Sequence, residues 1–218
     1  MLDYQKNFLE RIETFLPREL ARVELEALEI TQHMIDQRDW ESLERLFIGI
    51  LKRYEQEKLT PDSIRTADFE DDVARFIPDF RSRLQSPLAS AIELARKNGD
   101  VRVIWYNYEH GGDDNGKSQL VLADHYSERD DFYAPVPEHW LGNRIRKHPR
   151  FRLPKITIGV SGYTDYARKG AVEGSILMRA HLNSRIAAAV CQTIREIGDP
   201  GVPVVISRST YHPVIYKG

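Results

Sequence analysis

Residues 154–197 read PKITIGVSGYTDYARKGAVEGSILMRAHLNSRIAAAVCQTIREI, and this stretch decides the fold. A short β-rich run enters a glycine-containing loop, and a long segment without proline follows. The apolar residues of this segment recur at helical steps of three, four or seven: Val172, Ile176, Ala180, Ala187, Val190, Ile194 and Ile197. Gly198 can adopt the left-handed conformation that ends a helix, and Pro200 follows it. The pattern predicts a central helix over residues 172–197, laid across a sheet.

The middle of this predicted helix, residues 186–191, is apolar on every side. A helix that is apolar all round is buried. The residues just before it are polar and are interpreted as a solvated helix end: Arg179, His181, Asn183, Ser184 and Arg185. Cys191 is the only cysteine, so no internal disulfide can form, and we expect a small core residue there. Together these features predict a protein of the reducing cytoplasm.

The composition is ordinary for a globular protein. Of the 218 residues, 41% are hydrophobic and 29% are charged, and the length is sufficient for a substantial core. No run of eighteen apolar residues occurs, so no membrane-spanning helix is expected, and the acidic, amphipathic N-terminus does not have the layout of a signal peptide. The net charge of −2 is mildly negative and by itself does not favour a nucleic-acid partner.

The first hundred residues are rich in helix-forming side chains. One helix is predicted around residues 20–34, and Asp39 is predicted to cap the next one, whose apolar residues share a single face: Leu43, Leu46, Phe47, Ile50, Leu51 and Tyr54. Residues 60–62, Thr-Pro-Asp, form a helix-start signal. We expect the segment that follows to break at Pro78. A second helix should start at residues 86–87, Ser-Pro, and end at residues 98–99, Asn-Gly.

The periodicity changes to that of strands at Asp100. Two strands, residues 101–108 and 118–126, are predicted to form an antiparallel hairpin around a loop rich in Gly and Asp. Further β segments are expected at the residues that follow: 132–134, 156–160, 202–207 and 211–216. Pro203 and Pro213 indicate strand starts or edge positions.

The order of these elements predicts the α+β class. Helices come first, and a mostly antiparallel sheet packed on the long helix follows. The expected organisation is a helical region over residues 1–99 and an α+β region over residues 100–218, joined in one compact unit.

The hairpin loop and its flanks are the first candidate binding surface. Tyr106 and Tyr108 point to the same side of a strand, and His110, Asp113 and Asp114 follow in the loop. Aromatic rings supply contact area, and acids attract basic partners. The alternative is an exposed hairpin tip whose Asp and Gly residues serve turn geometry alone. The residue order matches no recognised calcium loop, so no metal is predicted here.

The basic run WLGNRIRKHPRFR over residues 140–152 is the second candidate. In an extended chain, one side would carry Arg144, Arg146, His148, Arg150 and Arg152, and Arg forks bind phosphate or carboxylate. The alternative is a solvated basic segment that pairs with acids elsewhere in the chain.

No catalytic motif is present. Residues 159–170 are rich in glycine but do not match the phosphate-loop or dinucleotide patterns, and the chain has no Gly-x-Ser-x-Gly elbow and no zinc-type His spacing. We therefore predict a non-catalytic cytoplasmic protein-binding module, such as an inhibitor or immunity-type protein, with no cofactor and no membrane association. The alternative is an enzyme or binder acting on a phosphate-bearing small molecule or nucleic acid through residues 144–152. The catalytic residues of such an enzyme remain unknown.

Overall fold

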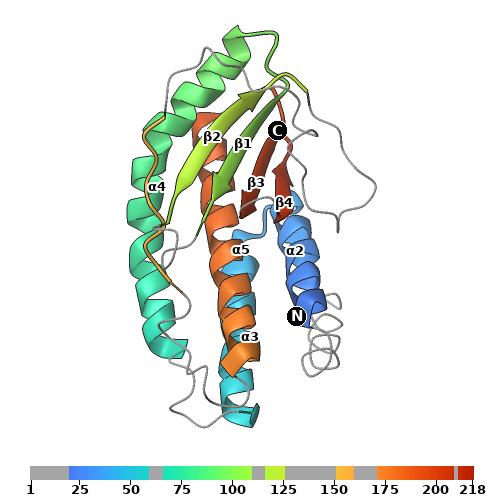
Figure 1. Cartoon of the computed structure of the whole chain (residues 1–218), viewed down its shortest axis with the longest axis vertical. Helices are drawn as coiled ribbons and strands as arrows, with labels where there is room; N and C mark the ends of the chain where they lie inside the picture. The colour runs from blue at the N-terminus through green and yellow to red at the C-terminus, as the bar shows by residue number, and fades with distance from the viewer. Residues whose placement is uncertain (1–19, 59–65, 110–115, 126–150, 160–170, 209–210) are drawn as a thin grey trace. The chain divides into compact units, whose positions relative to one another are not determined.

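The structure is a computed structural model that describes residues 20–58, 66–109, 116–125, 151–159, 171–208 and 211–218. Within these ranges the elements are α2 (Leu20–Asp36), α3 (Trp40–Lys58), α4 (Thr66–Lys97), β1 (Val103–Tyr108), β2 (Ser118–Ala123), α5 (Ala171–Ile197), β3 (Val204–Arg208) and β4 (Tyr211–Tyr216). Helices come first, and strands follow with one long helix inserted among them (Figure 1). The predicted α+β class is confirmed.

The chain groups into two compact units. Unit 1 comprises residues 1–75 and 159–186, and unit 2 comprises residues 76–158 and 187–218. Helices α4 and α5 therefore each contribute one segment to each unit. This grouping joins residues 76–99 to the sheet, whereas the helical region expected from the sequence extended to residue 99.

In unit 1, α2 and α3 form a helical hairpin with a short connection. Arg38 takes a left-handed conformation at φ 58°, and the amide of Asp39 donates to the carbonyl of Met34 over 2.9 Å. This arrangement closes the last turn of α2 as a Schellman-type cap does. The Asp39 side chain accepts a hydrogen bond from the amide of Ser42 at 3.1 Å, so the predicted N-cap of α3 is confirmed.

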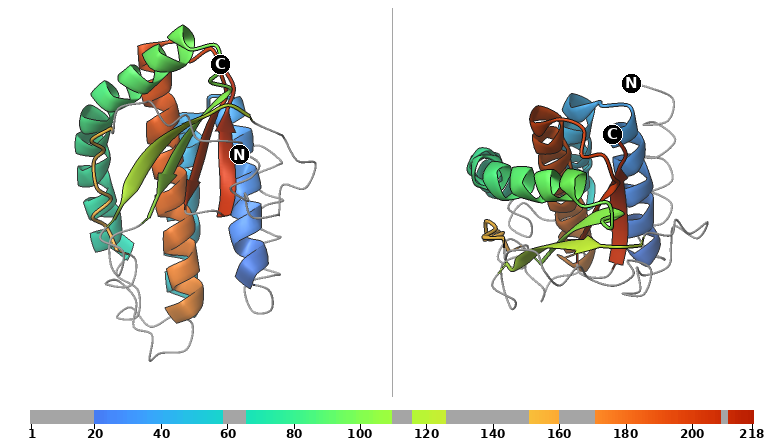
Figure 2. Two further views of the ribbon diagram at one scale, coloured as in Figure 1. Left: turned by 45° about the horizontal axis from the view of Figure 1, so that its top comes forward. Right: turned by 90° about the horizontal axis from the view of Figure 1, so that it is seen from above.

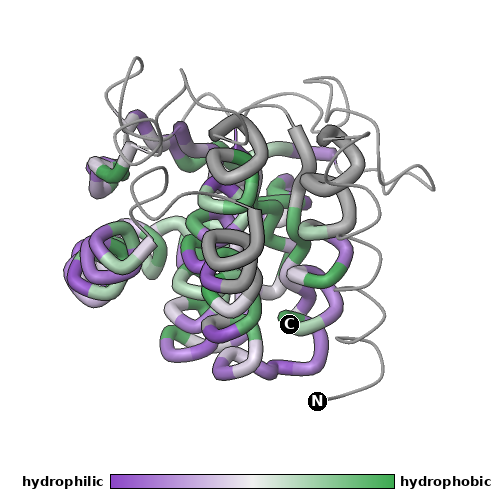
Figure 3. The backbone as a smooth tube through the Cα atoms, turned by 90° about the horizontal axis from the view of Figure 1, so that it is seen from below, coloured by the Kyte–Doolittle hydropathy of each residue, from purple (hydrophilic) through white to green (hydrophobic). Residues whose placement is uncertain are grey.

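Helix α4 corrects the sequence prediction. We expected a break at Pro78 and a new helix at Pro87, but both prolines lie inside one helix of 32 residues, drawn as an uninterrupted ribbon in Figure 2. Its buried residues continue at helical spacing past both prolines: Phe69, Val73, Ile77, Phe80, Leu84, Leu88, Ala91, Ile92 and Ala95. In Figure 3 the coil of α4, at the left, carries hydrophilic residues on part of its circumference and hydrophobic ones on the rest. Burial of this continuous face outweighs the local cost of each proline.

The four strands of unit 2 form one sheet in the order β2-β1-β3-β4 (Figure 1). The β1–β2 and β3–β4 pairs are antiparallel, which confirms the predicted hairpin, and the central β1–β3 pair is parallel. Pro213 lies in the edge strand β4, as predicted. The β3–β4 register shifts between Ile206 and Arg208, as at a β-bulge.

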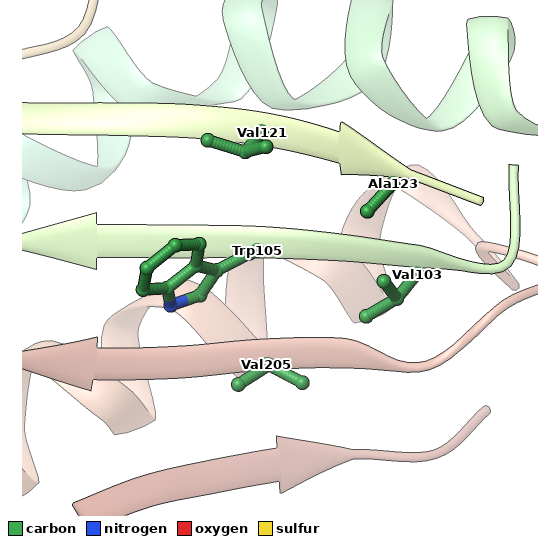
Figure 4. Packing of buried hydrophobic residues seen from close by; sticks show 5 residues of the cluster. All are labelled: Val103, Trp105, Val121, Ala123 and Val205. Carbon is green, nitrogen blue, oxygen red and sulfur yellow. The ribbon is translucent and has the colours of Figure 1, made fainter. Parts of the chain in front are cut away.

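The two faces of the sheet are both apolar. Side chains on one face come from β1, β2 and β3 and point the same way (Figure 4): Val103, Trp105, Val121, Ala123 and Val205. On the other face, the ring of Tyr106 meets that of Phe80 of α4 edge-on, with 6.4 Å between centroids. Alternation along β1 therefore separates two packed layers.

Helix α5 agrees with its prediction closely. It ends at Ile197, and the amide of Gly198, at φ 106°, donates to the carbonyl of Ile194 over 2.9 Å. Residues 186–191 are all buried, including Cys191. The all-round apolar run thus marks a buried helix segment, as expected.

The predicted strand at residues 156–160 is wrong over its described part. Residues 151–159 form no strand, although burial alternates at Pro154, Ile156 and Ile158. The amide of Ile156 donates to the carbonyl of Gly116 at 3.1 Å. This single backbone hydrogen bond joins the segment to the residues just before β2, but it does not add a strand to the sheet. The predicted helix start at residues 60–62 and the predicted strand at 132–134 lie outside the described residues.

Candidate functional site

The two predicted surface tyrosines lie inside unit 2. Tyr106 and Tyr108 do share one side of β1, with ring centroids 5.9 Å apart, but their exposed fractions are 0% and 3%. Burial raises the pKa of each phenol far above its ordinary value of 10, although a hydrogen bond with Ser118 opposes this effect at Tyr106 and the charge of Arg208 opposes it at Tyr108. Neither ring can supply contact area to a partner, because the strand places both against the interior rather than on the surface.

The other predicted binding residues lie outside the described residues. These are His110, Asp113 and Asp114 of the hairpin loop, and Arg144, Arg146, His148 and Arg150 of the basic run, whereas Arg152 at the end of that run is described and exposed. The structure therefore leaves their proposed roles as predictions. It does describe the points at which the hairpin loop leaves and rejoins the sheet.

The ends of β1 and β3 define the first candidate site. Because these strands are parallel neighbours, Tyr108 pairs with Arg208 at the last position of each strand. The β1–β2 and β3–β4 connections therefore both leave from this same end of the sheet. We call it the loop end and define it by Asn107, Tyr108, Glu109, Lys117 and Arg208.

Hydrogen bonds hold the strands firmly at the loop end. The amide of Glu109 donates to the carbonyl of Lys117 at 2.7 Å, which closes the base of the hairpin connection. The indole N–H of Trp105 donates to the hydroxyl of Ser207 at 2.7 Å, and both groups are buried. A fixed base of this kind is what positions binding loops in other scaffolds.

Two polar atoms at the loop end are buried and have no hydrogen-bond partner among the described residues. They are Oδ1 of Asn107 and Nε of Arg208, on residues that are themselves half-buried. A buried polar atom without a partner is unusual and calls for an explanation, such as an additional group that completes it. Exposed Lys117 and half-buried Glu109 add charge of both signs beside them.

A second polar constellation lies in unit 1, where α4 and α5 supply its members. The two oxygens of the Glu70 carboxylate each accept a hydrogen bond. Nε2 of His181 lies 2.5 Å from one oxygen, and Nη1 of Arg185 lies 3.1 Å from the other. The ring of Phe69 meets the His181 ring edge-on, with centroids 6.0 Å apart. We call the three polar residues the Glu70 cluster.

The electrostatics of the Glu70 cluster favour the ionised carboxylate. Partial burial acts to raise the pKa of Glu70, but the hydrogen bond and charge of His181 and the charge of Arg185 outweigh it, so the pKa lies below its ordinary value of 4.5. Since an ionised carboxylate only accepts hydrogen bonds, His181 must carry its proton on Nε2.

The Glu70 cluster overturns the interpretation of residues 179–185 as a solvated helix end. His181 is 0% exposed and Ser184 is 1% exposed, while Arg185 retains 11% of its side-chain surface. The cluster therefore joins α4 to α5 within unit 1. The sequence did not single out Glu70, because it lies 111 residues from His181 and no local spacing links them.

Comparisons of the chain with protein-family models, with curated proteins and with solved structures find no match. Among the described residues, no group of three or more His, Cys, Asp or Glu side chains is arranged to hold a metal ion. None of the helices in the described ranges is both long and apolar enough to cross a lipid bilayer.

Proposed function

We propose that this protein is a binding module without catalytic activity, of the inhibitor or immunity type, and that it holds a protein partner at the loop end of its sheet. The observation that carries the proposal is the parallel pairing of β1 with β3. It brings two hairpin connections, far apart in sequence, to one end of a rigid sheet.

The chemistry of this end supports a charged partner. The β1–β2 connection contains Asp113 and Asp114, and Glu109 stands at its base. Acids gathered on a loop steer a basic partner and oppose an acidic one.

The state of the Glu70 cluster supports the absence of catalysis. A general base must come within hydrogen-bond reach of the proton it removes. His181 is fully buried, and its Nε2 is hydrogen-bonded to the Glu70 carboxylate. Its surroundings suit a structural contact between helices better than an open reaction site.

Charge reversal at matched positions tests the proposal. The tagged full chain is used to capture its partner from native lysate, and the captured protein is then purified and titrated against variants. D113K/D114K reverses two adjacent acids in the β1–β2 connection. D71K/D72K reverses two adjacent acids on α4 and changes the net charge equally, which makes it a matched control.

We expect the loop variant to weaken the purified complex by at least about tenfold, a loss of about 1.4 kcal/mol, and the α4 variant to bind like the parent chain. Equal binding by both variants would contradict the assignment of the loop end. Turnover of a substrate by the isolated chain would contradict the non-catalytic part of the proposal, whatever the binding result.

A further inference from the structure

We propose that Asn98 is a site of spontaneous covalent modification, at which the backbone nitrogen of Gly99 attacks the side-chain amide of Asn98 and expels ammonia. Both residues lie in the turn that joins α4 to β1, and this turn belongs wholly to unit 2. The reaction is independent of the proposed binding function.

Two hydrogen bonds define the shape of this turn. The amide of Val101 donates to the backbone carbonyl of Asn98 at 3.0 Å, and the amide of Asp100 donates to the side-chain Oδ1 of Asn98, also at 3.0 Å. The second bond forms an Asx-turn. The ring that this bond closes contains both Cγ of Asn98 and the nitrogen of Gly99, so the turn keeps the two reacting atoms close together. The same bond polarises the side-chain carbonyl, which makes Cγ a better electrophile.

The attacking nitrogen and the leaving nitrogen are both accessible. Within the described ranges, no hydrogen-bond acceptor engages the amide of Gly99 or Nδ2 of Asn98. Gly99 is exposed, and no atom lies within 4 Å of the position that a Cβ would take on it. Water can therefore remove the proton from the Gly99 amide, and no neighbouring side chain blocks the approach of its nitrogen to Cγ.

The reaction balances without a cofactor or an oxidant. The deprotonated nitrogen of Gly99 forms a bond to Cγ of Asn98, the bond from Cγ to Nδ2 breaks, and Nδ2 leaves as ammonia. The product is a cyclic succinimide. Water then opens this ring at either of its carbonyl carbons. One opening gives aspartate on the original backbone, and the other gives isoaspartate, in which the backbone runs through the former side chain.

The isoaspartyl product lengthens the short connection between α4 and β1. It adds one carbon to the backbone between a helix that ends at Lys97 and a strand that begins at Val103. The amide of Arg102 is bound to the carbonyl of Ala123 at 2.8 Å, and Val101 is buried. The extra length must therefore be absorbed within residues 98–100, where it separates the groups that form the two hydrogen bonds of the turn. The isoaspartyl protein should unfold at a lower urea concentration than the aspartyl protein.

Peptide mapping of the full chain tests the modification. The folded protein is incubated at mildly alkaline pH, where backbone amides lose their protons more readily, and tryptic digests are analysed by mass spectrometry. Trypsin cuts after Lys97, Arg102 and Lys117, so Asn98 is separated from Asn115, which also precedes a glycine. The expected result is conversion of Asn98 to a mixture of aspartate and isoaspartate. Retention of the Asn98 amide in the folded chain, with conversion only in urea, would overturn the proposal.

Gly99→Ala is the control for the mechanism, since its Cβ hinders the attacking nitrogen and should slow the conversion at least about fivefold. Asn107 is the internal reference, because it lies within β1 and precedes the buried Tyr108, and it should keep its amide throughout. Equal rates in the parent chain and in Gly99→Ala would overturn attack by the Gly99 nitrogen.

Asn98→Asp carries the aspartyl product on the original backbone and is compared with the isolated isoaspartyl protein in urea denaturation. A lower midpoint for the isoaspartyl protein is the expected result. Equal midpoints would overturn the inferred effect on the connection between α4 and β1.

Discussion

Substitution of Gly116 by alanine should destabilise unit 2 strongly. Gly116 adopts φ 62°, and a Cβ placed on it would lie 2.0 Å from the carbonyl oxygen and 2.7 Å from the carbonyl carbon of Ile156. Both atoms belong to backbone, so the clash cannot be relieved by a change of rotamer. The segment around Ile156 would have to move by more than about 1 Å to restore an ordinary contact near 3.4 Å.

The magnitude follows from three contributions. A left-handed conformation costs a residue with Cβ about 1–2 kcal/mol. Loss of the Ile156–Gly116 backbone hydrogen bond costs about 0.5–1.5 kcal/mol. Displacement of the buried Ile156 side chain sacrifices part of its burial energy, up to about 1.5–3 kcal/mol. The free energy of unfolding should therefore fall by about 3–6 kcal/mol, which lowers the Tm by roughly 6–24 °C in a protein of this size.

Gly99→Ala is the matched control for this experiment. Gly99 has no atom within 4 Å of its Cβ position and no left-handed φ. Its substitution should change the free energy of unfolding by less than about 1 kcal/mol, with stabilisation as the expected direction. Urea denaturation of both variants, followed by circular dichroism, gives the comparison. A Gly116→Ala variant within about 1 kcal/mol of the parent chain would refute the packing of residues 151–159 on the hairpin.

Two further predictions concern the sheet. Trp105→Phe should destabilise the protein by about 1–3 kcal/mol because it removes the hydrogen bond to Ser207. A double-mutant cycle with Ser207→Ala should give a coupling energy of about 0.5–1.5 kcal/mol, and a coupling energy of zero would contradict that bond. Burial raises the pKa values of Tyr106 and Tyr108, so above pH 10 the folded state keeps both phenol protons while the unfolded state releases them. The free energy of unfolding should therefore fall by roughly 2–3 kcal/mol between pH 10 and pH 11. The Tyr106→Phe/Tyr108→Phe variant should show a flatter decline in urea titrations at these pH values, and an equal decline would contradict the assignment.

Local signals were sufficient for much of the fold. The long proline-free pattern before Gly198 predicted α5, and Asp39 predicted the start of α3, because each depends only on neighbouring residues. The β1–β2 hairpin followed from two short strands and a glycine-rich loop. Helix α4 was misread because the proline signals at positions 78 and 87 are local, whereas the apolar face that overrides them is stabilised by tertiary packing.

The candidate sites were less accessible from sequence. The pairing of β1 with β3 joins residues that have most of the C-terminal half of the chain between them, so no local pattern specifies it. Glu70 and His181 likewise meet only through the fold. Tyr106 and Tyr108 were correctly placed on one side of their strand, but alternation alone does not tell whether that side is covered.

The strand order also determines when the sheet can be completed during synthesis. The β1–β2 hairpin is synthesised first. One edge of β1 then stays unpaired until β3 is made, which follows only after residues 124–203. At about 5–20 residues per second, the delay is roughly 4–16 s. Throughout that interval the nascent chain presents the unpaired edge of β1, with its valine, isoleucine and aromatic residues, to any other strand it meets. The period of greatest aggregation risk for this protein therefore falls during translation rather than after it.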